Sequence, residues 1–327
     1  MTTVAITGVT GNFGHGLIPL LEADPRVKRV IGIGRRPFDP ADHGWTTVIY
    51  RRGDVRDPAV LTGAFAGADA VAHLAFAKFG HASRETLHAI NIDGTLNAFA
   101  AAAAAGARRF AFASSIAAYG FHADNPTPIP EDWPARGSSR WFYSREKAQV
   151  EARLREAATA HPDLALTIFR PTVVVGPQTA ATIGEIVPPA LRPLIRAVQR
   201  PLAALGVPTP TITLPHPLQL VHEEDVGQAL ALALLGGRAG TYNLAADGSV
   251  DGHELARELG LTPLPIPAVA VRTTARALLR VPRRPPALEA VEVLTQPVIV
   301  DAAAAKQQLG WHPRYTALEA LRATVRG

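Results

Sequence analysis

Short apolar runs alternate with longer amphipathic stretches through the first half of the chain. The apolar runs have the length and composition of buried strands and cover 3–7, 29–34, 47–50, 69–75, 109–114 and 164–170. Helical patterns lie between them, at 13–23, 58–66, 84–105 and 141–160. This alternation predicts an α/β fold with a doubly wound parallel sheet.

The pattern changes after Pro171. Residues 176–217 and 262–286 are rich in Pro and Arg, whereas the stretch between them contains a helix pattern and a strand pattern. We therefore expect residues 1–176 and 217–248 to form the core domain. Residues 177–216 and 249–327 are expected to form a smaller C-terminal lobe that binds the substrate.

The first strand runs into a glycine-rich turn, "TGVTGNFGHG", which opens the first helix. Gly8, Gly11 and Gly14 allow a sharp turn and a close approach of the backbone to a pyrophosphate at a helix N-terminus. The context predicts a Rossmann dinucleotide site in which Asn12 and Phe13 also contact the cofactor. The alternative is an ordinary glycine-rich turn between strand and helix.

The end of the second strand bears on the choice of cofactor. A carboxylate there would bind the ribose hydroxyls of NAD, but Gly34 stands at that position and Arg35 and Arg36 follow it. Two guanidinium groups suit a 2′-phosphate, so NADP(H) is favoured, with NAD(H) as the alternative. Both arginines would be solvated loop charges if this interpretation is wrong.

Tyr143 and Lys147 lie four residues apart in a predicted helix, so they share one face. A neighbouring ammonium favours the phenolate form of a tyrosine. Such a tyrosine can exchange a proton with a carbonyl or alcohol oxygen while hydride moves to or from a nicotinamide. Ser114 and Ser115 lie at the end of the fifth strand, and one of these two hydroxyls would polarise the same oxygen.

These motifs resemble the extended branch of the short-chain dehydrogenase/reductase superfamily, the NAD(P)-dependent epimerase/dehydratase-like proteins. The resemblance rests on "TGVTGNFG", "SSIAAYG", Tyr143-x-x-x-Lys147 and the C-terminal "LGWHPRYTALEAL". It implies catalytic roles for Ser115, Tyr143 and Lys147, a structural Asn91, and a homodimer built from the helices at 84–105 and 141–160. It also implies cofactor contacts from Asp54, Val55, Leu74, Ala75, Lys147, Pro171, Val173 and Val174.

Composition narrows the possible partners. The net charge is +5 and the pI about 9.9, but the arginines are scattered without an aromatic platform, so no nucleic-acid partner is expected. The chain has no Cys, its 11 His show no metal-ligand spacing, and we expect a cytoplasmic protein without a metal. Arg272, Arg276 and Arg280 form a stripe that could meet an anionic membrane, but its apolar side is expected to pack on its own lobe, and no membrane partner is expected.

Three functions remain open at this stage. The first is an NADP(H)-dependent ketone reductase or secondary alcohol dehydrogenase acting on a small, largely apolar substrate. The second is an NAD-dependent nucleotide-sugar epimerase or dehydratase, although Leu218 and Gln219 replace the Arg and Asp that such enzymes use near the diphosphate. Arg192, Arg196 and Arg200 could substitute for them. The third is a non-catalytic NADP(H) sensor.

Overall fold

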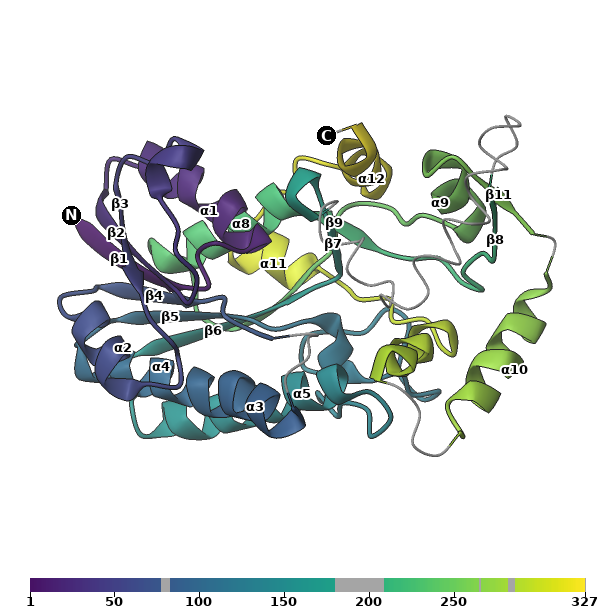
Figure 1. The fold of residues 1–327 in the computed structure, drawn as a ribbon, viewed down its shortest axis with the longest axis horizontal. Helices are drawn as coiled ribbons and strands as arrows, with labels where there is room; N and C mark the ends of the chain where they lie inside the picture. Colours follow the sequence, from purple (N-terminus) through teal and green to yellow (C-terminus); the bar gives the residue numbers. More distant parts are fainter. Residues whose placement is uncertain (78–82, 180–208, 265, 282–285, 327) are drawn as a thin grey trace.

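A central sheet of seven parallel strands organises the molecule (Figure 1). The computed structural model describes residues 1–77, 83–179, 209–264, 266–281 and 286–326. The strand order is β3-β2-β1-β4-β5-β6-β10, which confirms the predicted doubly wound α/β class. The strands are β1 (Thr2–Thr7), β2 (Val27–Gly34), β3 (Val48–Arg52), β4 (Ala70–His73), β5 (Arg109–Ala113), β6 (Ala165–Pro171) and β10 (Thr241–Leu244).

Both faces of the sheet are covered by helices, because neighbouring strand residues point to opposite sides and both sides are apolar. Val4 and Ile6 pack beneath one helical layer, and Ala5 between them packs against the other. The first layer contains α1 (Asn12–Ala23), α8 (Glu223–Leu234) and α11 (Ala303–Gln308). The second contains α2 (Pro58–Phe65), α4 (Gly94–Ala104) and α5 (Phe142–Thr159).

The helix predicted over 84–105 is continuous in the chain but not regular. It consists of α3 (Arg84–His88), a π-helical turn η2 (Ala89–Asp93) and α4. The side chain of Asn91 leaves this turn, accepting a hydrogen bond from the Ala77 backbone N–H and donating to the Ala77 carbonyl oxygen. The π-turn thus ties the helix to the segment that follows β4.

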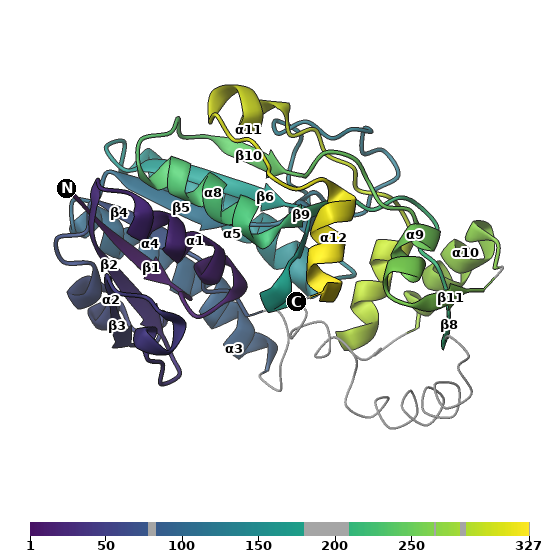
Figure 2. The same ribbon diagram turned by 90° about the horizontal axis from the view of Figure 1, so that it is seen from above.

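Separate parts of the chain build the second lobe (Figure 2). Strand β8 (Thr209–Thr211) pairs with β11 (Leu261–Pro263), and β7 (Val173–Val175) pairs with β9 (Leu220–His222). The remaining elements of this part are α9 (Gly252–Glu258), α10 (Ala268–Leu278), η4 (Pro286–Leu294) and α12 (Ala317–Arg326).

The C-terminal region does not stay within this lobe. Ala305, Leu309 and Trp311 are buried in the core between the sheet and α8, and the indole N–H of Trp311 donates to the Asp225 carbonyl oxygen. The expected lobe range 249–327 therefore differs from the observed packing over α11 and Trp311. The boundaries of the two domains remain a prediction for the rest of the chain.

The strand order reverses between β1 and β4. From β1 the chain proceeds outward to β2 and β3, and it then returns to add β4, β5 and β6 on the other side. In open α/β sheets, ligands bind outside the carboxyl ends of the strands at such a reversal. The carboxyl ends of β1, β2, β4, β5 and β6 are therefore where a site is expected.

Candidate active site

The glycine-rich turn lies at this reversal point and fits a dinucleotide phosphate. Gly8 has φ +69°, and a Cβ there would stand 2.6 Å from the backbone nitrogen of Ala75. A Cβ on Gly14 would stand 1.8 Å from the Val9 carbonyl oxygen. Helix α1 starts after the N-cap Gly11 without a side-chain cap and has no acidic residue in its first turn. Its N-terminus can therefore accept an anion.

Asn12 and Phe13, the other predicted members of this turn, already have partners. The Asn12 side-chain amide donates to the Thr179 hydroxyl at 3.1 Å, which joins the turn to the segment after β7. The Phe13 ring is half-buried against the core under α1. Leu74 and Ala75 lie directly over Gly8, so the structure brings these two predicted cofactor segments together.

At the end of β2, any side chain in place of Gly34 would have to displace the Tyr50 hydroxyl. A Cβ at Gly34 would stand 2.7 Å from the Tyr50 hydroxyl oxygen. That hydroxyl donates to the Arg36 carbonyl oxygen, and the Arg52 guanidinium donates to the Arg35 carbonyl oxygen. These two bonds hold the loop through the backbone carbonyl oxygens of Arg35 and Arg36. The side chains of both arginines are exposed and take no part in these two bonds.

Asp54 and Val55 are the predicted adenine contacts. The Asp54 carboxylate accepts hydrogen bonds from the Arg56 backbone and guanidinium, and these bonds lower the pKa of Asp54. Val55 is buried against Gly94, and its carbonyl oxygen accepts a hydrogen bond from Asn97. Both residues therefore have structural partners here, and their contact with adenine stays a prediction.

Helix α5 carries the predicted Tyr–Lys pair. The Lys147 ammonium is buried and donates to the Ala113 carbonyl oxygen at 2.6 Å. It also lies 3.5 Å from the centre of the Phe76 ring and 5.9 Å from that of the Tyr143 ring. The cation is thereby held between the end of β5, the segment after β4 and the tyrosine.

The two candidate serines have different surroundings. Ser114 is buried, and its hydroxyl donates to a Glu151 carboxylate oxygen at 2.6 Å. Ser115 is half-buried and caps the 3-10 helix η3 (Ile116–Tyr119) through a 3.2 Å bond from the Ala117 N–H. Since the Ser114 hydroxyl is committed to a buried carboxylate, Ser115 is the better candidate to meet a substrate oxygen.

A distant segment fixes the start of α5 beside Tyr143. The backbone N–H of Phe142 donates to a carboxylate oxygen of Glu289 in η4 at 2.8 Å. The buried Glu289 also pairs with Arg84, and the Ser144 hydroxyl donates to the Ala117 carbonyl oxygen. Residues from α3, η3 and η4 thus hold the helix end on which Tyr143 lies. Sequence reasoning missed Glu289, because nothing local distinguishes it.

Aromatic rings border Tyr143. The Tyr143 ring lies 5.7 Å from that of Phe76 and 5.4 Å from that of Trp141, and Trp141 lies 5.6 Å from Phe121. All four are half-buried. At the carboxyl end of β6, Pro171 is buried. In β7, Val174 is half-buried and Val173 is exposed. The rings of Phe76 and Trp141 therefore border the tyrosine directly.

A histidine that the sequence did not single out stands at the end of β4. The His73 Nδ1 lies 2.8 Å from the Thr7 hydroxyl, and its Nε2 lies 3.0 Å from the Thr95 hydroxyl. Complete burial, and then the charge of Lys147, lower the pKa of His73 from 6.5 to about 3. His73 is therefore a neutral bridge between β1 and α4 near the cofactor turn.

This bridge makes stability depend on pH. Between pH 6.5 and about 3, His73 is protonated in the unfolded chain but stays neutral in the folded chain. The free energy of unfolding therefore falls as the pH drops through this range. The contribution is ~1 kcal/mol per pH unit. Urea unfolding at several pH values measures how the free energy of unfolding depends on pH. This dependence should be weaker in His73→Gln than in the unmodified protein. Exposed His253→Gln should keep the original slope; equal slopes for all three proteins would contradict this role.

A buried ion pair supports the serine turn from below. Arg170 donates to both carboxylate oxygens of Glu151, with a shortest N–O distance of 2.6 Å. The guanidinium also lies over the Tyr119 ring at 4.4 Å. Since the same carboxylate accepts from Ser114, the pair connects β6 and α5 with the turn that carries Ser115.

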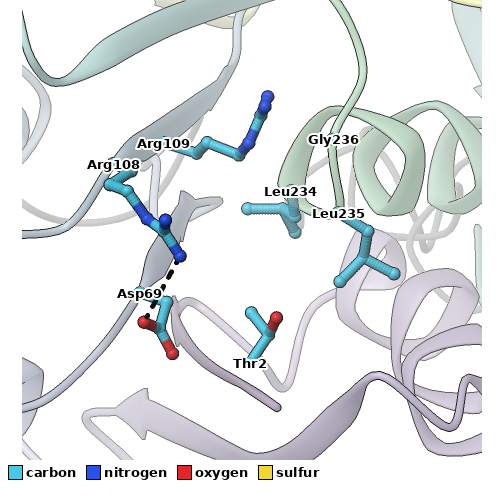
Figure 3. Close-up of a pocket in the computed structure, with 7 residues that line it drawn as sticks. All are labelled: Thr2, Asp69, Arg108, Arg109, Leu234, Leu235 and Gly236. Carbon is cyan, nitrogen blue, oxygen red and sulfur yellow. Dashed lines mark ion pairs between the residues drawn. The ribbon is translucent and has the colours of Figure 1, made fainter.

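A cavity of about 260 Å³ lies at the opposite edge of the sheet (Figure 3). Its lining includes Asp69 and Arg108, which form an ion pair at 4.0 Å, and the end of α8. Arg109 donates to the carbonyl oxygens of Ala233 and Gly237 and so caps α8. These side chains hold elements together and lie away from the predicted catalytic residues. Among the described residues, no group of three or more His, Asp or Glu side chains is arranged to hold a metal ion.

Comparison with known proteins agrees with this arrangement. Residues 4–245 match the model of the NAD dependent epimerase/dehydratase family. The chain belongs to this family. It is therefore a nicotinamide-dependent short-chain dehydrogenase/reductase enzyme, as the sequence motifs predicted.

Individual relatives of this epimerase/dehydratase family member span most of its length. A UDP-glucose 4-epimerase of Yersinia pestis is 31% identical over 266 residues, covering 74% of this chain and 77% of the relative. An uncharacterised protein of Mycobacterium tuberculosis is 27% identical over 331 residues, covering 99% and 83%. A solved UDP-glucose 4-epimerase from Stenotrophomonas maltophila, with bound NAD and formylated UDP-arabinopyranose, has TM-score 0.71 and 23% identity, covering 100% and 97%.

These comparisons favour the second of the three functions over the first. The family is one of epimerases and dehydratases, and the Yersinia pestis relative is a UDP-glucose 4-epimerase, whereas the sequence motifs favour a ketone reductase. The family supports a nicotinamide cofactor without supporting a preference for NADP.

Proposed function

We propose that this enzyme oxidises a secondary alcohol carbon of a sugar-like substrate and returns the hydride after the carbon has been rearranged, as an epimerase or dehydratase does. The observation that carries the proposal is the placement of Lys147 between Ala113 and Tyr143 beside the Ser115 turn, in a chain of this family. The cofactor would be held by the turn from Gly8 to Gly14, with Leu74, Ala75, Val173 and Val174 around it.

The protein side chains would move one proton. Tyr143 takes the hydroxyl proton of the substrate, and Ser115 donates a hydrogen bond to the same oxygen as its charge changes. The buried Lys147 ammonium stabilises the ionised tyrosine. A nicotinamide held by the glycine-rich turn would supply the hydride acceptor and donor. The half-buried rings of Phe76 and Trp141 limit the access of water to this oxygen.

A net reductase is the second candidate, because Leu218 and Gln219 stand at the two described positions where the usual diphosphate partners would lie. The Gln219 amide makes two hydrogen bonds with the Val300 backbone, and Leu218 pairs through its backbone with Val250. Neither side chain takes the place of an Arg or Asp near a diphosphate. Arg192, Arg196 and Arg200 lie outside the described residues. The roles of Leu218 and Gln219, and the Phe76 and Trp141 rings beside Tyr143, favour a substrate that carries little charge near the reacting carbon.

The two candidates differ in what happens to the cofactor. We would incubate the enzyme with NAD⁺ or NADP⁺ and with UDP-glucose, UDP-N-acetylglucosamine and a panel of simple secondary alcohols. An epimerase or dehydratase converts its substrate, by mass spectrometry and NMR, without accumulation of absorbance from reduced cofactor. A net dehydrogenase accumulates reduced cofactor in proportion to product. Failure of every probe, with firm cofactor binding, would overturn both and favour a non-catalytic sensor.

The cofactor itself is proposed to be NADP(H), with NAD(H) as the competing choice. The glycine at position 34, where an NAD-binding acid would stand, and the exposed Arg35 and Arg36 support this choice. The NAD bound in the Stenotrophomonas maltophila epimerase favours NAD(H).

Removing one guanidinium tests the cofactor proposal. Arg35→Ala should weaken NADPH binding about 10- to 100-fold, since a charged hydrogen bond to the 2′-phosphate is lost, and should leave NADH binding nearly unchanged. Calorimetric titration measures both affinities. Arg29→Ala, at an exposed position within β2, is the matched control. Tighter binding of NADH than NADPH by the unmodified protein would overturn the preference.

A further inference from the structure

The second lobe exposes large apolar side chains at one end of the molecule. Strands β8 and β11 are parallel, with Thr211 opposite Pro263, so Ile212 and Leu264 leave the pair side by side. Their exposed fractions are 58% and 37%. Ile266 follows at 36%. Single exposed apolar residues are common, but neighbouring ones of this size indicate an interaction surface.

Helix α10 begins two residues after Ile266. Val271, Ala275 and Leu279 are buried on its inner face, whereas Val269 on the other face is 64% exposed. Arg276 and the following Arg280 are exposed and lie seven and eleven residues after Val269, which places all three on one side of the helix. Figures 1 and 2 show α10 at the outer end of the lobe, far from the N-terminal strands.

The charge of this surface has one sign. Residues 259–281 contain three Arg and no Asp or Glu. The acidic residues of the neighbouring elements have other partners or are buried. Asp251 and Glu254 form the capping box of α9, Glu258 pairs with Arg322, and Glu289 and Glu292 of η4 are buried. Such a combination of exposed apolar and basic side chains complements an anionic, partly apolar surface.

We propose that this lobe surface, made of Ile212, Leu264, Ile266, Val269, Arg276 and Arg280, binds the anionic headgroup region of a lipid bilayer. The apolar side chains enter the interface, and the arginines pair with lipid phosphates. The binding is peripheral; no helix among the described residues is long and apolar enough to cross a membrane. This inference does not depend on the proposed reaction.

The position of the surface connects it with the candidate active site. Helix α10 packs on η4, and Glu289 of η4 caps the start of α5 next to Tyr143. Only one element therefore separates the membrane-facing helix from the tyrosine end of α5. Docking would bring the substrate lobe, rather than the cofactor turn, to the bilayer. The sequence predicts that the apolar side of this helix packs on its own lobe, which agrees with the buried Val271 and Ala275. That prediction gives no role to the exposed outer face of α10.

Sedimentation with lipid vesicles tests the proposal. The full chain should bind vesicles containing roughly 30% phosphatidylserine in phosphatidylcholine and should not bind pure phosphatidylcholine. Binding should weaken strongly when salt is raised about tenfold, since exposed charges are then screened. Arg276→Ala with Arg280→Ala should lower the partition coefficient about 25-fold, at about fivefold per arginine. Val269→Asp should also reduce it strongly.

The control removes the same charge from other elements. Arg29→Ala with Arg153→Ala, both exposed on the core domain, should leave vesicle binding within about twofold. Equal loss in this control would show nonspecific attraction and overturn the proposal, as would no binding to anionic vesicles at low salt. Sedimentation velocity without lipid tests whether a second copy of the chain occupies this surface. An oligomer that Val269→Asp dissociates would assign the surface to self-association and overturn the proposal.

Discussion

Tyr143→Phe should lower turnover about 10²- to 10⁴-fold, because loss of the hydroxyl removes the group that exchanges a proton with the substrate oxygen. Cofactor affinity should change little, since the ring and its contacts with Phe76 and Trp141 are retained. The measurement is turnover of the substrate identified in the cofactor experiment, together with calorimetric titration of NADPH and NADH. Lys147, which lies against the same ring, would keep its bond to Ala113 in this variant.

Tyr315→Phe is the matched control for that experiment. It removes the same hydroxyl from another tyrosine, which bonds to Glu224 and stacks on His222. Turnover should remain within about threefold of the unmodified enzyme. Retention of most activity by Tyr143→Phe would show that another group carries the proton and that the proposed mechanism is wrong. Equal losses in both variants would point to a structural effect.

The parts of the fold that sequence predicted are those with local causes. Two-sided apolar runs specify strands buried on both faces, and Gly8 is needed because its φ is +69° and Ala75 crowds it. The pairing of Tyr143 with Lys147 follows from helical spacing alone. These features require no knowledge of what lies far along the chain, so a single sequence is sufficient for them.

The parts that sequence did not predict depend on distant partners. Glu289 meets the start of α5 across 147 positions, and His73 lies between Thr7 and Thr95 on two other elements. Gln219, read from the sequence as a departure in a diphosphate site, is used to hold Val300. No local pattern distinguishes such residues from ordinary surface or core positions, because their roles arise only when the elements pack.

Glu151→Ala should lower the free energy of unfolding by ~3–5 kcal/mol, because it leaves the buried Arg170 without a counter-charge. Urea unfolding followed by tryptophan fluorescence measures the loss. Glu258→Ala breaks an exposed pair with Arg322 and should cost far less. The double change Glu151→Leu with Arg170→Met should recover much of the stability, since an apolar pair avoids an unpaired buried charge.

The same variants separate stability from positioning of the serine turn. Glu151 also accepts the Ser114 hydroxyl next to Ser115, so the double variant can be stable and still have low turnover. Recovery of stability without recovery of turnover would assign Glu151 a positioning role for the turn. Recovery of both would restrict it to the fold. If Glu151→Ala costs no more than Glu258→Ala, Arg170 finds another counter-charge, and the buried pair does not hold β6, α5 and the serine turn together.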